Sequence, residues 1–314
     1  TDEQQGIFGE VAFDLNDQFT ITAGARWYDI EVDLEGSAAG SFGNFGASAD
    51  NNMGNNLDTL FSGVNPDTAS ADGTITKLSL SWTPNADSLF YATFSEGFRP
   101  GLLNRPGGAT NPSGTFTVPF AVDTDELTNY ELGWKLDLLD SNLRFNGAVF
   151  FSDIEDLQTG IFDASITNLF FTDNAADAEV KGVEGDILWM PESLDGLTVS
   201  GSFAFNDSEI TKVITPTNDV TKGDSLAFAP EFQFSLRARY EWGIGSGRVA
   251  HCMPRATYSD ASYSDIITIN RAKMDDWLML GFTAGVTVDN WSAEFFAENI
   301  TDETAEISRS FIYD

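Results

Sequence analysis

Residues 130–138 read Tyr-Glu-Leu-Gly-Trp-Lys-Leu-Asp-Leu, and this stretch decides the fold. Every second residue is apolar or aromatic, while the residues between them are Glu131, Gly133, Lys135 and Asp137. Successive side chains of a β-strand point to opposite faces of the sheet. The alternation therefore predicts a strand with one continuous apolar face and one polar, charged face.

The same alternation recurs along the whole chain. It is clear again in residues 232–242 and 278–288. Several of the segments reach the roughly 9–11 residues that a tilted membrane-spanning strand needs, more than the five or six usual in soluble proteins. We predict twelve strands, near residues 6–15, 19–34, 74–83, 88–98, 127–138, 142–153, 180–190, 196–207, 228–242, 247–259, 276–288 and 291–300.

The connections between these segments alternate between short and long. Successive antiparallel strands put their turns at opposite ends of a sheet, so all the long connections would lie at one end. Outer-membrane barrels have this asymmetry, and they carry Trp and Tyr near their strand ends, as this chain does. A soluble sandwich would keep its loops short. The long connections are residues 35–73, 99–126, 154–179, 208–227 and 260–275.

The predicted fold class is therefore all-β, a transmembrane antiparallel up-and-down β-barrel with short periplasmic turns and long extracellular loops. Two details resist the pattern. The apolar parity switches at Trp27–Tyr28, which indicates either a bulge or the point where the strand leaves the bilayer. Pro254 falls inside a predicted strand and fits there only at an edge, a bulge or a strand end.

Composition narrows the function classes. The 314 residues contain no run of 18 apolar residues, which excludes a transmembrane helix. The net charge of −33 argues against nucleic acid as a partner, because binding phosphates needs a basic face. Much of the acid lies in segments predicted to be loops, such as residues 50–72 and 173–179. Aromatic residues reach 13%, so the chain must bury or embed a large aromatic surface.

No catalytic constellation is visible, and we predict no enzyme and no cofactor. Because His251 is the single histidine, a two-histidine metal site is excluded. His251 has polar strand parity, so its expected role is a hydrogen bond in the lumen. The single cysteine, Cys252, has apolar strand parity and is expected to be a lipid-facing or packed residue. Residues 50–73 carry oxygen ligands but lack the spacing of a calcium loop, so no metal site is predicted.

Charged residues on the polar parity are the candidates for function. In a barrel they would face the lumen, where they line a water path or pair with whatever fills it. Direct contact with a ligand stays open as the alternative. These lumen-facing candidates are Glu131, Lys135, Arg144, Arg237 and Arg239.

Four segments resemble the TonB-dependent receptor family, the plugged 22-stranded transporters of the outer membrane. Residues 91–100 resemble the family's strand that ends in a "GFRxP"-type motif, with Gly101 where a second proline is common. Residues 174–186 resemble its "N-A … KGVE" strand opening. Residues 19–27, FTITAGARW, are similar to its "LTLTAGLRY" strand, and residues 298–303 resemble its "NLTD" element. The motif positions carried over are Gly97, Phe98, Arg99, Pro100, Lys181, Gly182, Glu184, Asn299 and Asp302.

The resemblance implies that residues 1–314 are a partial receptor-like barrel domain, about twelve of 22 strands. The plug domain, the earlier strands and the last strand would lie outside this segment. An open sheet leaves two unpaired edges, which hydrocarbon does not tolerate, so the segment should not close into a barrel unaided.

The resemblance also implies energy-coupled uptake of a large scarce solute, such as a ferric siderophore, cobalamin or a glycan, across the bacterial outer membrane. The implied partners are outer-membrane lipid, the plug domain of the same protein, the TonB energy-coupling complex and the small-molecule or metal-chelate ligand. Arg99 would either end its strand or touch that ligand. Two other functions remain open, namely a porin-like diffusion channel and a loop-based adhesion or binding barrel.

Overall fold

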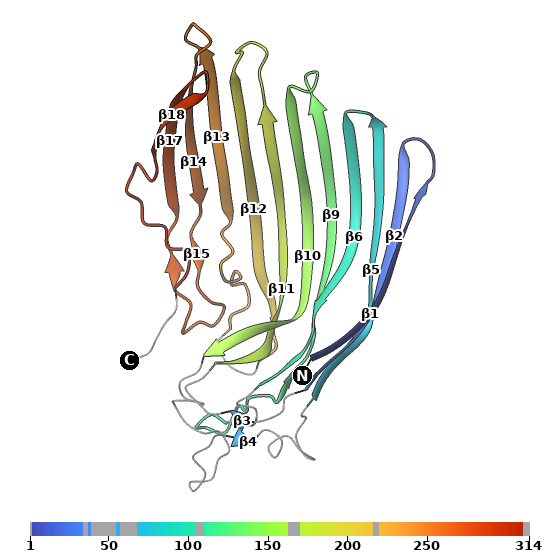
Figure 1. Ribbon diagram of the computed structural model, residues 1–314. Coiled ribbons are helices and arrows are strands. Elements are labelled where there is room, and N and C mark those ends of the chain that lie inside the picture. The colour runs from blue at the N-terminus through green and yellow to red at the C-terminus, as the bar shows by residue number, and fades with distance from the viewer. Residues whose placement is uncertain are drawn as a thin grey trace.

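The structure, a computed structural model, describes residues 2–33, 37–38, 55–56, 68–104, 108, 110–162, 170–215 and 220–309. Within these ranges no helix is long and apolar enough to cross a membrane. Figure 1 shows one large sheet, in which twelve antiparallel strands follow one another in chain order. They are β1 (Asp2–Asp14), β2 (Phe19–Asp33), β5 (Thr68–Asn85), β6 (Ser88–Arg99), β9 (Asp125–Leu138), β10 (Leu143–Phe162), β11 (Phe170–Trp189), β12 (Leu197–Val213), β13 (Phe232–Gly243), β14 (Val249–Ser259), β17 (Trp277–Val288) and β18 (Trp291–Ala297).

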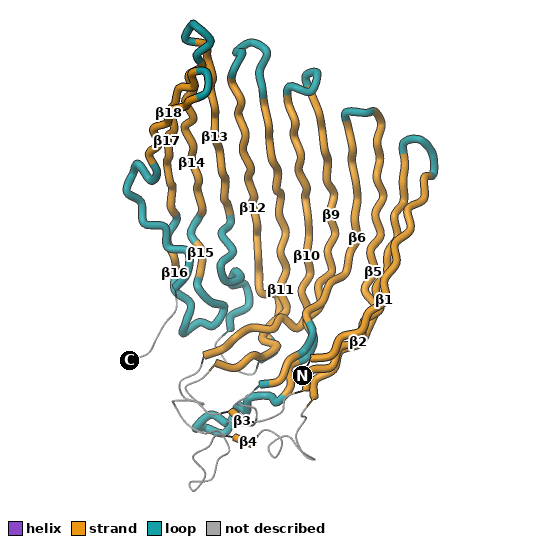
Figure 2. Tube along the Cα trace, viewed as in Figure 1, coloured by secondary structure: helices purple, strands orange, loops and turns teal. Residues whose placement is uncertain are grey.

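The predicted all-β, up-and-down fold is confirmed. All twelve predicted segments form strands of this sheet, with β1 and β18 as its two edges, and the described residues do not close it into a barrel. Figure 2 shows the short turns together at one end, the short-turn end, and the longer connections at the other, the long-loop end. Three small pairs lie in the long connections: β3 (Ser37–Ala38) with β4 (Asn55–Asn56), β7 (Leu102–Leu103) with β8 (Ala121–Val122), and β15 (Ser262–Tyr263) with β16 (Lys273–Met274).

Strand lengths correct part of the prediction. Most of the segment 154–179, predicted to be a loop, belongs to β10 and β11, and the first residues of the segment 208–227 belong to β12, which ends at Val213. The acidic segment 173–179 is likewise strand rather than loop. The pairing of β10 with β11 continues past register shifts between Ile154 and Gln158 up to Phe162 and Phe170. The alternation of apolar and polar residues fades there, although the backbone hydrogen bonds continue.

The cross-strand registers define an apolar face and a polar face. Tyr130 and Leu132 of β9 pair with Phe151 and Val149 of β10 on the apolar face. This face is open to the surroundings, since Leu132 is 62% and Tyr130 is 52% exposed. A large exposed apolar surface of this kind marks contact with a membrane or a partner.

Acidic pairs end the apolar band toward the long-loop end. Asp153 of β10, two residues beyond Phe151 on the same face, pairs with Glu179 of β11. Glu155 pairs with Glu126 of β9 at the next position. Carboxylates in hydrocarbon are costly, so the part of the sheet that can cross a bilayer ends before these pairs.

Glycines allow aromatic rings to lie flat across neighbouring strands. A Cβ added to Gly147 would lie 2.4 Å from Cζ2 of Trp134, and one added to Gly133 would lie 2.3 Å from Cζ of Tyr91. The Tyr91 hydroxyl is thereby placed to donate to Oε1 of Glu131 at 2.6 Å. A side chain at either glycine would push the ring away.

The two irregular positions have physical explanations. The pairings of β2 with β1 and β5 run without a shift through Trp27 and Tyr28, so the bulge alternative is wrong. Tyr28 and Ile30 are instead buried in a small cluster near the long-loop end. Pro254 lies within β14, an interior strand, so an edge position is wrong. The pairing of β14 with β13 is interrupted here, between Arg255 and Cys252, because proline has no N–H to donate.

Candidate functional site

A hydrophobic core lies at the long-loop end of the sheet. The ends of β10 and β11 bend across this end (Figure 1) and pack with three connecting segments. Val118 and Ile210 are fully buried, with 0% exposure. The connections are therefore folded structure rather than loose loops. The buried members of this loop core are Phe116, Val118, Ile161, Phe171, Ala175, Ala176, Ile210, Val220, Ile266 and Ile267.

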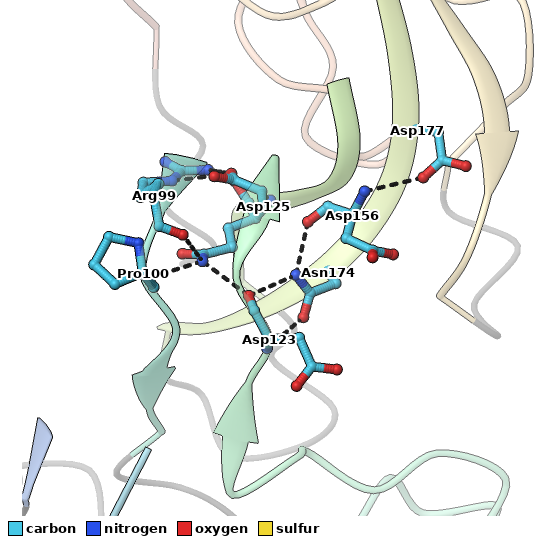
Figure 3. Close-up of polar contacts among 8 residues, drawn as sticks. Arg99, Pro100, Asp123, Asp125, Asp156, Asn174 and Asp177 are labelled. Carbon is cyan, nitrogen blue, oxygen red and sulfur yellow. Dashed lines mark hydrogen bonds and ion pairs between the residues drawn. The ribbon is translucent and has the colours of Figure 1, made fainter. Parts of the chain in front are cut away.

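A polar network ties the base of the loop core to the sheet, and it begins at Arg99 (Figure 3). Arg99 is the last residue of β6, and its Nε donates to Oδ2 of Asp125 at 3.0 Å. Nη2 contacts the same carboxylate and also donates to the carbonyl oxygen of Gln158 at 2.7 Å. The carboxylate of Asp125 is nearly buried, so the guanidinium compensates a charge that is poorly solvated.

Gln158 is the centre of this network. Its side chain is buried, and its Nε2 lies 3.0 Å from the carbonyl oxygen of Pro100, 2.9 Å from that of Asp123 and 3.3 Å from that of Arg99. Its backbone N–H donates to Oδ2 of Asp125 at 3.2 Å. One residue of β10 thus fixes the end of β6 and the segment leading into β9.

Asn174 makes the matching contacts from β11. Its Oδ1 accepts from the backbone N–H of Asp123 at 2.8 Å, and its Nδ2 donates to the carbonyl oxygens of Asp123 at 2.9 Å and Asp156 at 2.6 Å. Asp156 has a φ of 54° and lies at the register shift of β10. Its N–H donates to Oδ1 of Asp177 at 3.0 Å. The two motif segments around Arg99 and Asn174 therefore meet at one place.

Two carboxylates here, both beyond the apolar band, have pKa values shifted in opposite directions, although burial raises both. Burial raises the pKa of Asp173, and hydrogen bonds from Thr215 and from the Asn174 backbone only partly oppose this. Burial also pushes the pKa of Asp177 upward, but the hydrogen bond from the Asp156 N–H and the Lys212 ammonium outweigh it and leave that pKa lowered. Asp177 has a cation at 2.9 Å, the ammonium of Lys212, whereas burial is the largest influence on the pKa of Asp173.

The remaining motif positions have structural contacts. Phe98 stacks on Tyr28 with ring centroids 3.6 Å apart, while a Cβ at Gly97 would meet only ordinary contacts. Lys181 forms an exposed ion pair with Asp207 at 3.1 Å. A Cβ at Gly182 would lie 2.4 Å from the Phe205 carbonyl oxygen, so this position needs glycine.

The element at residues 298–303 forms a tight turn just after β18. Oδ1 of Asn299 accepts from the N–H of Glu303 at 2.8 Å, and Nδ2 of Asn299 donates to the Glu303 carbonyl oxygen at 2.8 Å. Asp302 has a φ of 54° and donates its N–H to the Asn299 carbonyl oxygen at 3.1 Å. The predicted strand 291–300 ends at Ala297 because this turn follows.

The five lumen-facing candidates share the polar face of the sheet. Lys135 pairs with Asn146, and the register continues through Asp186, Ser202 and Ser235 to the face that carries Arg237 and Arg239. They are not gathered into one cluster, because three strands separate β9 from β13. Four of them have local side-chain partners: Tyr91 for Glu131, Asp137 for Arg144, Ser200 for Arg237 and Glu241 for Arg239.

Sequence reasoning missed Asp125 and Gln158, the two buried polar groups of the network. Neither lies in a motif, and both fall in segments that the sequence predicts to be long connections, 99–126 and 154–179. Glu184 lies on the polar face, where it and Lys135 line the same hollow. His251 is buried, with Nε2 3.2 Å from Oε2 of Glu294. The described residues contain no group of three or more possible metal ligands, and most of the segment 50–73 lies outside them.

The family model described as "TonB dependent receptor-like, beta-barrel" matches residues 1–300. Among curated proteins, the metal-pseudopaline receptor CntO of Pseudomonas aeruginosa is 28% identical over 165 residues, which are 52% of this chain and 21% of that protein. The probable TonB-dependent siderophore receptor PiuA of Acinetobacter baumannii is 22% identical over 198 residues, 60% of this chain and 24% of that protein. This chain thus aligns with about a quarter or less of each relative.

Solved structures show the same fold. The ferric yersiniabactin uptake receptor FyuA of Yersinia pestis superposes with a TM-score of 0.67 at 16% identity, covering 96% of this chain and 41% of that one. The siderophore receptor PiuA superposes with a TM-score of 0.64 at 18% identity, covering 96% and 39%. The twelve strands therefore correspond to less than half of each receptor chain.

Proposed function

The chain belongs to the TonB-dependent receptor-like β-barrel family, and from this premise we propose that it is the barrel wall and mouth of an outer-membrane receptor for a metal chelate. The ligand class is the one for which two relatives are named, metal-pseudopaline for one and a siderophore for the other. The observation that carries the proposal is the folded long-loop end. A loop core of this kind gives a receptor a shaped entrance.

In this proposal the two faces of the sheet have different roles. The exposed apolar face contacts outer-membrane lipid, since water would disfavour so large an apolar surface. The polar face, with Glu131, Lys135, Arg144, Arg237 and Arg239, faces the lumen and the plug domain. Force from the TonB complex acts on the plug, while this wall stays passive.

The network around Gln158 has a mechanical role in this proposal. It holds the bent ends of β10 and β11 to β6 and β9 through buried hydrogen bonds. Arg99 ends its strand by this contact, which favours the strand-ending role over contact with ligand. A mouth held in one shape loses less conformational entropy when a ligand binds.

Uptake measurements test the function. Cells that lack the protein, and the same cells carrying it, are given radioactive iron loaded onto siderophores from an iron-starved culture of the native host. Each strain is compared with and without TonB. We expect accumulation only when both the protein and TonB are present.

The alternatives give different results in the same cells. An open porin-like channel would accumulate label without TonB and would show steady conductance in a planar bilayer. An adhesion or binding barrel would retain label at the cell surface without accumulation inside. Equal accumulation with and without the protein, under every condition, would overturn the receptor proposal.

A further inference from the structure

A hollow of about 550 Å³ lies in the apolar face of the sheet, across β5, β6, β9 and β10. Ala92 of β6 lies within it and pairs with Leu80 of β5 on one side and Leu132 of β9 on the other. The Ala92 methyl group is shorter than the two flanking leucine side chains, so the surface is recessed between them. All three residues line the hollow.

Three aromatic rings border the hollow on the side of the long-loop end. Phe94, Tyr130 and Phe151 lie on three neighbouring strands, with ring centroids 5.4 Å apart for the first two and 6.4 Å apart for the last two. Glu131 also borders the hollow, but its carboxylate accepts from Tyr91 on the polar face. The walls that the apolar face contributes are therefore mainly hydrocarbon.

A row of carboxylates lies beyond these rings, at the edge of the apolar band. Asp153 of β10 pairs with Glu179 of β11, which pairs with Glu209 of β12. Glu126 and Glu155 pair with each other one position further along β9 and β10. Like charges directly opposite one another destabilise a sheet, so this acidic row favours a partner that brings positive charge.

The cations near the acidic row do not balance it. Lys181 pairs with Asp207, one position below the row, and Lys212 pairs with Asp177. Both ammonium groups lie close enough to the row to interact with it, but each already has a carboxylate of its own. Arg105 is the only basic residue of the chain outside the described ranges, so it can neutralise at most one carboxylate.

We propose that the hollow and the acidic row together bind one lipid whose headgroup carries an ammonium group. One acyl chain would fill the hollow, since a void beside the chain forfeits dispersion contacts. The ammonium group, with three N–H donors and one positive charge, would lie among the carboxylates. The proposal rests on the proposed contact of the apolar face with outer-membrane lipid and adds a preferred lipid class and its place on the wall.

Other occupants complement this surface less well. A lipid with a purely anionic headgroup would be repelled by the acidic row. A second copy of this chain could cover the apolar face, but both copies would have the same orientation in the membrane. A symmetric contact would then bring the two acidic rows against each other.

Titration of the full chain in detergent micelles tests the site. Dioleoyl phosphatidylethanolamine and dioleoyl phosphatidylglycerol have the same acyl chains, and only the first has an ammonium group. Native mass spectrometry counts the lipid molecules retained by each protein molecule and gives the dissociation constant of the first one.

One pair of variants tests the hollow. Ala92→Leu fills it and keeps an apolar surface toward lipid. The matched control is Ala238→Leu on the apolar face of β13, where Ala238 pairs with Val199 away from the hollow. Circular dichroism checks that both variants keep the strand content of the unmodified protein.

A second pair of variants tests the acidic row. Asp153→Asn combined with Glu155→Gln removes two charges from the row at nearly constant shape. Glu184→Gln combined with Asp186→Asn removes the same two charges from the polar face of β11, so the net charge of the protein changes equally.

We expect phosphatidylethanolamine to bind at least about threefold more tightly than phosphatidylglycerol, a modest preference because exposed charges are screened. Ala92→Leu should weaken binding of both lipids about tenfold, because the chain loses its hollow, and Ala238→Leu should change neither. Neutralising Asp153 and Glu155 should abolish the preference, whereas neutralising Glu184 and Asp186 should leave it intact.

Three results would overturn the lipid site: equal affinity of the unmodified protein for the two lipids, equal effects of Ala92→Leu and Ala238→Leu, or equal loss of the preference in the two neutralised variants. Dimers in micelles that Ala92→Leu breaks would assign the hollow to a second copy and would overturn it as well. None of these measurements involves metal uptake or TonB, so failure of the lipid site and failure of the receptor function are distinguishable.

Discussion

The wall of the sheet and its long-loop end are built on different physical rules. In the wall each residue belongs to one of two faces, and large apolar side chains such as Leu132 remain exposed at 62%. At the long-loop end apolar side chains such as Ile210 are fully buried, and polar groups such as Gln158 satisfy backbone carbonyls. The wall resembles a membrane surface, whereas the long-loop end resembles the interior of a soluble protein.

This difference between the two regions predicts where a substitution should lower the stability of the fold most. Removing apolar atoms from the loop core leaves a cavity, because neighbouring side chains surround them. Removing them from the wall leaves a gap that lipid can fill. Adding charge to the apolar face should also be costly if that face contacts lipid as proposed, whereas the polar face should tolerate it.

The largest expected effect is a cavity in the loop core. Ile210→Ala should destabilise the folded long-loop end by about 2–5 kcal/mol, because Ile210 is fully buried. Leu80→Ala on the apolar face, where Leu80 is 42% exposed, serves as the matched control and should have a much smaller effect. Protease cleavage within the long connections, followed against denaturant, measures the difference. Equal effects would remove the distinction between the two regions.

A charge on the wall should have the next largest effect. Leu132→Arg should destabilise the folded protein in lipid vesicles by about 2–4 kcal/mol, because the guanidinium would face hydrocarbon. Ser202→Arg, on the polar face of β12, is the control and should be tolerated. Urea unfolding in vesicles, read by tryptophan fluorescence, gives both values. Destabilisation by Ser202→Arg alone would mean that the two faces have been assigned the wrong way round.

Loss of the polar network should have an intermediate effect confined to the loops. Gln158→Leu leaves three backbone carbonyls without their shared donor and should weaken the long-loop end by about 1–3 kcal/mol. Gln233→Leu, at an exposed position of β13, is the control. Amide hydrogen exchange should become faster in Gln158→Leu only, and only at the long-loop ends of β10 and β11, after Asp153 and before Glu179. Uniform exchange across the whole sheet would contradict a local network.

The smallest effect should come from an exposed ion pair. Lys181 and Asp207 are 3.1 Å apart, with side chains 56% and 53% exposed. Lys181→Met should leave stability almost unchanged, because water and salt screen such pairs. The same urea titration measures it. A larger loss would show that this motif position contributes more than its geometry indicates.

The wall could be predicted from the sequence, and the long-loop end could not. Alternation such as that of residues 130–138 is local, so each strand can be recognised from about ten consecutive residues. Gln158 and Asn174 act through carbonyl oxygens of residues 99, 100 and 123, far away in the chain. Only the fold brings these groups together, and no spacing in the sequence encodes their contact.

The strand ends illustrate the same limit. The sequence predicts a long connection over residues 154–179, but residues 154–162 and 170–179 belong to β10 and β11. Backbone pairing and the loop core nevertheless hold them as strands. The motif positions Arg99 and Asn299 were identified by resemblance, but their roles, one in a network and one in a turn, required geometry.

The most direct test of the two-faced wall is a cysteine scan along β9. In a Cys252→Ser background, single cysteines replace residues 130, 131, 132, 135, 136 and 137 and carry a fluorescent label. Brominated lipid chains then quench labels that lie in hydrocarbon. We expect strong quenching at 130, 132 and 136 and weak quenching at 131, 135 and 137. Equal quenching at all six positions would contradict the assignment of an apolar, lipid-contacting face.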